Sequence, residues 1–237
     1  MYYELCQAVC RANLLLEAYN LVTFTWGNVS GIDRSTGVIV IKPSGVAYDD
    51  LSPDKMVVVD LNGTVVEGKL RPSSDTPTHL ELYRRFKDIG GICHTHSPKA
   101  TMWAQACREI PCLGTTHADY FYGPVPVTKT MTAEEIEGDY ELNTGKAIVQ
   151  RFEGIDPMQM PAVLVANHGP FTWGPDANKA IENAVVLEQV ADIALGTISI
   201  NPAQTAIAKV LLDRHFLRRH GDGAYYGQGN IQGKQGS

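Results

Sequence analysis

The sequence has little cysteine and no excess of positive charge. Its five cysteines are an odd number without the spacing of a disulfide scaffold, which favours reduced thiols and a cytoplasmic location. With 20 basic and 26 acidic side chains the net charge is −6, which argues against nucleic acid or an anionic membrane surface as the main partner. An anionic ligand would have to be held by a local group of hydrogen-bond donors instead.

The sequence also lacks a signal-peptide pattern and an uncharged apolar run of membrane length. Its N-terminus has no cationic region followed by an apolar core. The most apolar late stretch, 184–200, is interrupted by Glu188 and Asp192, whereas a membrane span needs about 20 apolar residues. Without internal repeats or a clear linker, the 237 residues suit a single large domain, which we place at 1–228.

Apolar periodicity and turn residues predict hairpins mixed with helices. Asn62-Gly63 indicates a tight hairpin, and Thr132 with Glu135 forms a capping-box pattern at a helix start. We expect helices at 2–19, 77–87, 98–106, 132–152, 176–195 and 203–219, and extended segments at 21–25, 38–41, 56–60, 64–67, 91–96 and 162–166, the last as a central strand, with 111–128 irregular. This order favours one α/β domain with a central mixed, largely antiparallel sheet flanked by helices.

Three histidines follow apolar strand-like runs. His94 and His96 alternate along one predicted strand, so they share a face, while Cys93 points the other way. His168 has the same position after 162–166, beside a glycine. Three such histidines fit a catalytic zinc site, although imidazole also suits other divalent transition metals. Asp75 either joins this site, as ligand or base, or caps the helix that follows it.

Three loops carry small hydroxyl-bearing or glycine residues. They are Gly27-Asn28, Ser44-Gly45 and Ser73-Ser74. Short side chains let backbone N–H groups approach an anion, and Lys42 would add positive charge nearby. Together with the histidines, these loops suggest a phosphorylated substrate.

Seven motifs together resemble the L-ribulose-5-phosphate 4-epimerase branch of the class II aldolase/adducin family. They are Thr25-Trp-Gly-Asn-Val-Ser30, Lys42-Pro-Ser-Gly45, Pro72-Ser-Ser-Asp-Thr-Pro-Thr-His79, His94-Thr-His96, Gly114-Thr-Thr-His-Ala-Asp-Tyr-Phe-Tyr-Gly123, Asn167-His-Gly169 and Ala224-Tyr-Tyr-Gly-Gln228. The resemblance covers residues 1 to about 228. The tail 229–237 is polar and rich in Gly and Gln, and we expect it to be disordered.

The resemblance implies a zinc-dependent epimerase of a phosphorylated ketopentose in pentose catabolism. Its reaction breaks the C3–C4 bond, giving the enediolate of dihydroxyacetone and glycolaldehyde phosphate, and rejoins them on the other aldehyde face. It implies Asp119 and Tyr226 as the acid/base pair and a homotetramer with sites between subunits. By the same resemblance, the metal set is His94, His96 and His168 with Asp75 nearby, and the substrate set is Gly27, Asn28, Lys42, Ser44, Gly45, Ser73 and Ser74.

Two other functions stay open at this point. A sugar-phosphate aldolase similar to L-fuculose-1-phosphate aldolase would share the metal site, but such aldolases typically carry Glu at the position of Asp75 and lack the 224–228 motif. A non-catalytic adducin-like module would not need three intact histidines. The roles of His79, His215, Arg218 and His220 are undecided, and His117 is a weak candidate ligand.

Overall fold

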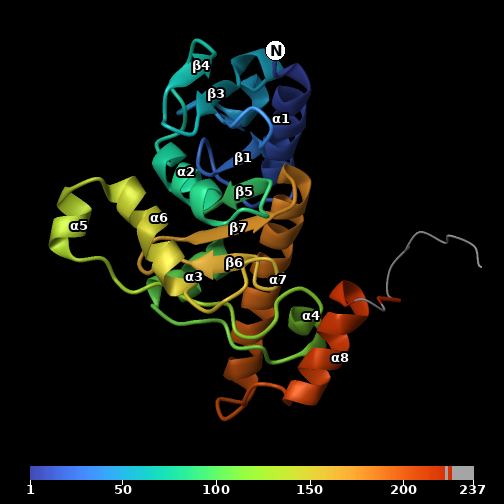
Figure 1. Cartoon of the computed structure of the whole chain (residues 1–237). Helices are drawn as coiled ribbons and strands as arrows, with labels where there is room; N and C mark the ends of the chain where they lie inside the picture. Colours follow the sequence, from blue (N-terminus) through green and yellow to red (C-terminus); the bar gives the residue numbers. More distant parts are fainter. Residues whose placement is uncertain (222–223, 226–237) are drawn as a thin grey trace, which may run out of the picture.

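A seven-stranded sheet forms the middle of the molecule (Figure 1). The structure is a computed structural model that describes residues 1–221, 224 and 225. The strands lie in the order β4-β3-β2-β1-β5-β7-β6, and their bounds are β1 (Asn28–Asp33), β2 (Val38–Ile41), β3 (Val57–Asp60), β4 (Val65–Glu67), β5 (Gly91–His94), β6 (Ala162–Leu164) and β7 (Pro170–Gly174). All six strand pairings in this described part are antiparallel.

Helices cover both faces of the sheet (Figure 1). On one face lie α1 (Tyr3–Ala18) and α7 (Ala177–Ile200), and on the other lie α2 (Thr76–Arg85) and α6 (Tyr140–Arg151). The remaining helices are α3 (Pro98–Gln105), α4 (Thr115–Ala118), α5 (Ala133–Glu137) and α8 (Lys209–His220), with short 3-10 turns at Tyr48–Asp50 and Pro53–Lys55. The predicted single α/β domain with a largely antiparallel sheet is confirmed.

Strand β2 is apolar at every position because it separates two cores. In β2, Ile39 and Ile41 enter the core beneath α2, whereas Val38 and Val40 enter the core beneath α1. Alternate side chains of a strand point to opposite faces, so a strand covered on both faces needs apolar residues at every position.

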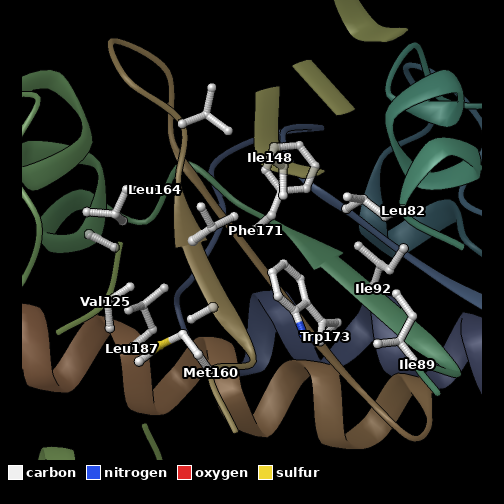
Figure 2. Packing of buried hydrophobic residues seen from close by; sticks show 14 of the residues in the cluster. Leu82, Ile89, Ile92, Val125, Ile148, Met160, Leu164, Phe171, Trp173 and Leu187 are labelled. Carbon is white, nitrogen blue, oxygen red and sulfur yellow. The ribbon is translucent and has the colours of Figure 1, made fainter. Parts of the chain in front are cut away.

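The larger core joins the sheet to α2 and α6. Figure 2 shows Ile92 of β5 and Phe171 and Trp173 of β7 with Leu82 of α2 and Ile148 of α6. All five are fully buried. Burying a side chain of this kind contributes about 1.5–3 kcal/mol, so this contact fixes how α2 and α6 lie against the sheet.

The helix α7 is long and apolar enough to cross a membrane, judged by length and composition alone. In this fold it packs along β7 and β5, with Leu187 and Val190 in the larger core. Two of its acidic residues, Glu188 and Asp192, bind α3. Glu188 accepts hydrogen bonds from the backbone N–H of Lys99 and Ala100, at 2.8 and 3.0 Å, and Asp192 pairs with the Lys99 ammonium at 2.9 Å.

Several predicted elements are wrong in position. The extended segment 21–25 is not a strand. The strand that follows it is β1, which was not predicted and which contains Asn28, Ser30 and Gly31. The run 162–166 forms β6, which lies at the sheet edge rather than its centre, because the unpredicted β7 pairs between it and β5. The predicted helix 203–219 begins only at Lys209.

The segment 132–152 is two helices instead of one. The capping box of Thr132 and Glu135 is confirmed, but α5 ends at Glu137, and α6 begins at Tyr140. Gly138 and Asp139 separate them, and the break turns the start of α6 toward the ends of the central strands. The short helix α4 also lies in a segment that we expected to be irregular.

Replacing Gly91 with Ala should destabilise the fold. A Cβ there would lie 2.3 Å from the backbone nitrogen of Ala177, where α7 begins against β5. Relieving such an overlap costs about 1–3 kcal/mol of unfolding free energy. Urea denaturation measures it, with Gly196→Ala as the matched control: that glycine lies inside α7 in open space, so the change should stabilise by about 0.5–1 kcal/mol. Equal stability of the two variants would contradict this packing.

Candidate metal centre

Three histidine side chains converge at one end of the sheet. Nε2 of His96 lies 3.1 Å from Nε2 of His94 and 3.1 Å from Nε2 of His168. A tetrahedral metal with Zn–N bonds of about 2.0–2.1 Å would separate its ligand nitrogens by about 3.3 Å. These two separations are nearly those that such an ion requires, and all three ligand atoms lie within 4.8 Å of one another.

Two of the imidazoles, those of His96 and His168, have the protonation that a metal ligand needs. Burial lowers the pKa of His168 to about 4, helped by His94 and His96, and burial with the nearby His94 also lowers the pKa of His96. Both rings are therefore neutral near pH 7, with a lone pair on one nitrogen. Nδ1 of His94 lies 2.9 Å from the carbonyl oxygen of Pro170, to which it donates when Nε2 carries the lone pair.

His94 occupies the last position of β5, and His96 lies in the short segment 95–97 that leads into α3. His94 pairs with Asn28 of β1 on one side and with Phe171 of β7 on the other, so these three side chains form a row on one sheet face. The ring of His94 stacks on Phe171, with ring centroids 4.1 Å apart. The segment that carries His96 leads directly into α3. The first turn of α3 is fixed by Glu188, which accepts hydrogen bonds from the backbone N–H groups of Lys99 and Ala100.

His168 lies in the tight turn between β6 and β7 rather than directly at the end of a strand. In this turn the N–H of His168 donates to the carbonyl of Val165, and Asn167 has φ of +61°. Gly169 lets the turn approach the other two histidines, because a Cβ there would lie 2.8 Å from the carbonyl oxygen of Thr95. The sequence analysis singled out His168 but did not predict this turn.

Asp75 lies at the start of α2 but makes no side-chain cap, so the capping alternative is wrong. Its Oδ2 accepts a 2.6 Å hydrogen bond from Nδ2 of Asn28. Burial alone would raise the pKa of Asp75, but His94, His79 and the Asn28 hydrogen bond outweigh it and lower the pKa. The carboxylate is thus ionised beside the histidines, although within the described residues the close ligand group is made by the histidines alone.

One cavity of about 590 Å³ brings the predicted residues together. It is lined by all of the residues predicted to bind metal or substrate, which are Gly27, Asn28, Lys42, Ser44, Gly45, Ser73, Ser74, Asp75, His94, His96 and His168. The loops are joined by backbone hydrogen bonds, from Ser44 to the carbonyl of Arg71 and from Ser73 to the carbonyl of Lys42. The histidines and the small-residue loops therefore face the same space.

Lys42 lies deeper in the wall of this cavity than expected. Its ammonium group donates to the carbonyl oxygens of Val46 at 2.8 Å and Thr25 at 3.3 Å, and it lies 4.9 Å from the ring centre of Tyr48. Burial lowers its pKa to about 8. Lys42 thus connects two of the cavity loops and leaves a positive charge behind their surface.

Sequence reasoning missed Tyr140 and Glu141, which also line the cavity. A continuous helix over 132–152 gave no reason to place them there. The signal was the pair Gly138-Asp139, a helix breaker followed by a residue type that favours the position before a helix.

Asp119 does not line the cavity of its own chain. Arg218 donates to both of its carboxylate oxygens, at 3.0 and 2.8 Å, and Nδ1 of His215 lies 3.1 Å from Oδ1. His220 contacts its backbone oxygen at 2.9 Å. Asp119 is therefore part of a polar cluster between α4 and α8, and its predicted partner Tyr226 lies outside the described residues.

The two remaining histidines have structural contacts. His117 is buried, with Nε2 2.8 Å from the carbonyl oxygen of Gly123, so it supports that turn. His79 is also buried and contacts the hydroxyl of Ser30 through Nδ1 at 2.7 Å, while its Nε2 has no partner in the described structure. Neither belongs to the metal-ligand group found among the described residues.

Comparison with known proteins identifies the family. A model of the class II aldolase and adducin N-terminal domain matches residues 7–195. An L-fuculose 1-phosphate aldolase is 26% identical with a TM-score of 0.76, over 90% of this chain and 94% of that one. L-fuculose-1-phosphate aldolase of Thermus thermophilus is 24% identical with a TM-score of 0.67, over 86% of this chain and 100% of that one. YgbL of Klebsiella pneumoniae, a candidate aldolase/epimerase/decarboxylase, is 22% identical with a TM-score of 0.69, over 89% of this chain and 97% of that one. Because the family model spans most of the sequence, the chain belongs to the class II aldolase and adducin family.

Proposed function

We propose that this protein is an L-ribulose-5-phosphate 4-epimerase, which interconverts L-ribulose 5-phosphate and D-xylulose 5-phosphate in cytoplasmic pentose catabolism. The observation that carries the proposal is the single cavity shared by the three-histidine group, Asp75 and the small-residue loops. A divalent metal, zinc in this proposal, would be held by His94, His96 and His168 and would supply a Lewis acid for the enediolate charge.

The loops on the far side of the cavity are suited to the phosphate. Ser44 and Ser74 offer hydroxyl donors, and Gly45, with φ of +71°, leaves its backbone open to an approaching anion because nothing would contact a Cβ there. Lys42 adds positive charge from behind the wall. Asn28 uses its amide to orient Asp75, which places an ionised carboxylate between the phosphate loops and the histidines.

The reaction also needs proton transfer on both faces of the aldehyde. The C4 hydroxyl loses its proton as the C3–C4 bond breaks, and the C4 oxygen regains a proton after the enediolate attacks the opposite face. We assign these transfers to Asp119 and Tyr226. Since Asp119 lies with α8, outside its own cavity, we propose that it acts in the cavity of an adjacent subunit in a homotetramer.

The alternative is an aldolase that releases the aldehyde. The 26% identity to an L-fuculose 1-phosphate aldolase favours it. Two features favour the epimerase: Asp75, where such aldolases typically carry Glu, and the motif 224–228. An adducin-like module without catalysis is disfavoured by the converging histidines.

The direct test is an assay of zinc-loaded protein with L-ribulose 5-phosphate. We expect D-xylulose 5-phosphate to form without net release of glycolaldehyde phosphate. L-fuculose 1-phosphate serves as the comparison substrate in the same assay. Faster cleavage of that substrate would establish the aldolase, and no reaction with either would overturn both enzyme proposals.

Replacing His96 with Asn should lower zinc content and activity together, because one of three ligands is lost. Loss of a residue that only supports a metal ligand typically lowers metal affinity or activity about 10- to 100-fold, and loss of a ligand itself should lower them at least as much. Metal analysis of the purified protein measures the zinc, and thermal unfolding checks the fold. His220→Asn, which changes a histidine remote from the cavity, should retain zinc. Full activity of zinc-free His96→Asn protein would refute the metal mechanism.

Mixing two inactive variants tests whether Asp119 acts between subunits. Asp119→Asn and His96→Asn should each be inactive alone. After subunit exchange some sites combine an intact histidine group with an intact Asp119 from the neighbour, so activity should return. The same test applies to Tyr226→Phe. If exchange is demonstrated and activity stays absent, each of these residues acts in its own chain or not at all.

A further inference from the structure

Tyr140 is held firmly at the wall of the metal cavity. It is the first residue of α6, directly after the unpredicted break at Gly138 and Asp139. The hydroxyl of Thr144 donates to the carbonyl of Tyr140 at 2.9 Å, within the first turn. The hydroxyl of Thr78 on α2 donates to the carbonyl of Glu141 at 2.6 Å, so the start of α6 is attached to α2.

The hydroxyl of Tyr140 points toward one of the three converging histidines. It lies 3.4 Å from Nδ1 of His168, and the two ring centres are 6.1 Å apart. The other nitrogen of that imidazole, Nε2, lies 3.1 Å from Nε2 of His96. His168 therefore directs one nitrogen into the histidine group and the other toward α6.

A neutral histidine that binds a metal through Nε2 carries its proton on Nδ1, and this N–H needs an acceptor. His94 meets the requirement with the carbonyl oxygen of Pro170. A phenol oxygen accepts a hydrogen bond while keeping its own proton.

We propose that Tyr140 is a positioning residue for His168. Its hydroxyl oxygen accepts the Nδ1–H, which fixes the tautomer and the plane of the imidazole with Nε2 directed at the metal. The inference rests on the metal site of the proposed function and is independent of which sugar phosphate reacts there.

The test compares zinc affinities of metal-free protein by titration against a competing chelator. Tyr140→Phe keeps the ring and removes only the hydroxyl, so the fold should be preserved. We expect the zinc dissociation constant to rise about 10- to 100-fold, as is typical when a hydrogen-bond partner of a metal ligand is lost. Tyr19→Phe makes the same chemical change at an exposed residue at the end of α1 and should leave zinc affinity unchanged.

A second measurement reports on the tautomer itself. In zinc-loaded protein with ¹⁵N-labelled histidine, the Nδ1–H of His168 should be protected from solvent exchange, and this signal should exchange faster in Tyr140→Phe. Loss of the signal in His168→Asn identifies it. A role in packing alone would change neither the exchange nor the zinc affinity.

The outcomes separate this inference from the proposed function. If Tyr140→Phe binds zinc within twofold of the wild type, the positioning role is overturned. If the wild type binds no zinc, both the metal site and the role of Tyr140 are overturned. If the wild type binds zinc tightly, Tyr140→Phe binds it weakly, and L-ribulose 5-phosphate does not react, the positioning role stands and the epimerase proposal falls.

Discussion

The pairing of β5 with β7 is the interaction on which the candidate site depends. It sets His94 opposite Phe171, and the carbonyl of the adjacent Pro170 lies 2.9 Å from Nδ1 of His94. The turn that leads into β7 then brings His168 to the same place, and Gly169 removes the side chain that would otherwise meet Thr95. A shift of register by one residue would turn His94 to the opposite face of the sheet, so the group forms only in this register.

The same arrangement explains why polar residues occur inside an otherwise apolar structure. Asn28 and Ser30 lie on the α2 face of β1 and are buried. Burying a polar group without a partner costs about 1–3 kcal/mol, and each of these side chains reduces that cost with hydrogen bonds. Asn28 binds Asp75 and Ser73, and Ser30 contacts His79 and Tyr83. The polar end of the sheet is thus supported by a hydrogen-bonded layer between β1 and α2.

Much of this structure could be predicted where one pattern dominates the sequence. The uniformly apolar β2 and the hairpin turn at Gly63 lie where the sequence indicated, and the three histidines that converge in the structure were singled out because each follows an apolar run. The prediction failed for β1 and β7. Their residues Asn28 and Pro170 oppose the strand pattern. Pairing with neighbouring strands makes these segments strands, β2 and β5 for β1, and β5 and β6 for β7.

The failure at α6 has the same physical origin. Locally, 132–152 satisfies helical periodicity, and the capping box even marks its start. Gly138 and Asp139 interrupt this pattern, and packing then sets the direction of α6: Gly145 lies so close to α2 that a Cβ would be 2.8 Å from Cβ of Glu81. A tertiary contact thus delivers Tyr140 to the cavity, whereas Asp119 stays with α8. The chain holds its three converging histidines at one end of the sheet and Asp119 on a separate pair of helices, a division that suits the proposed site completed by a second copy.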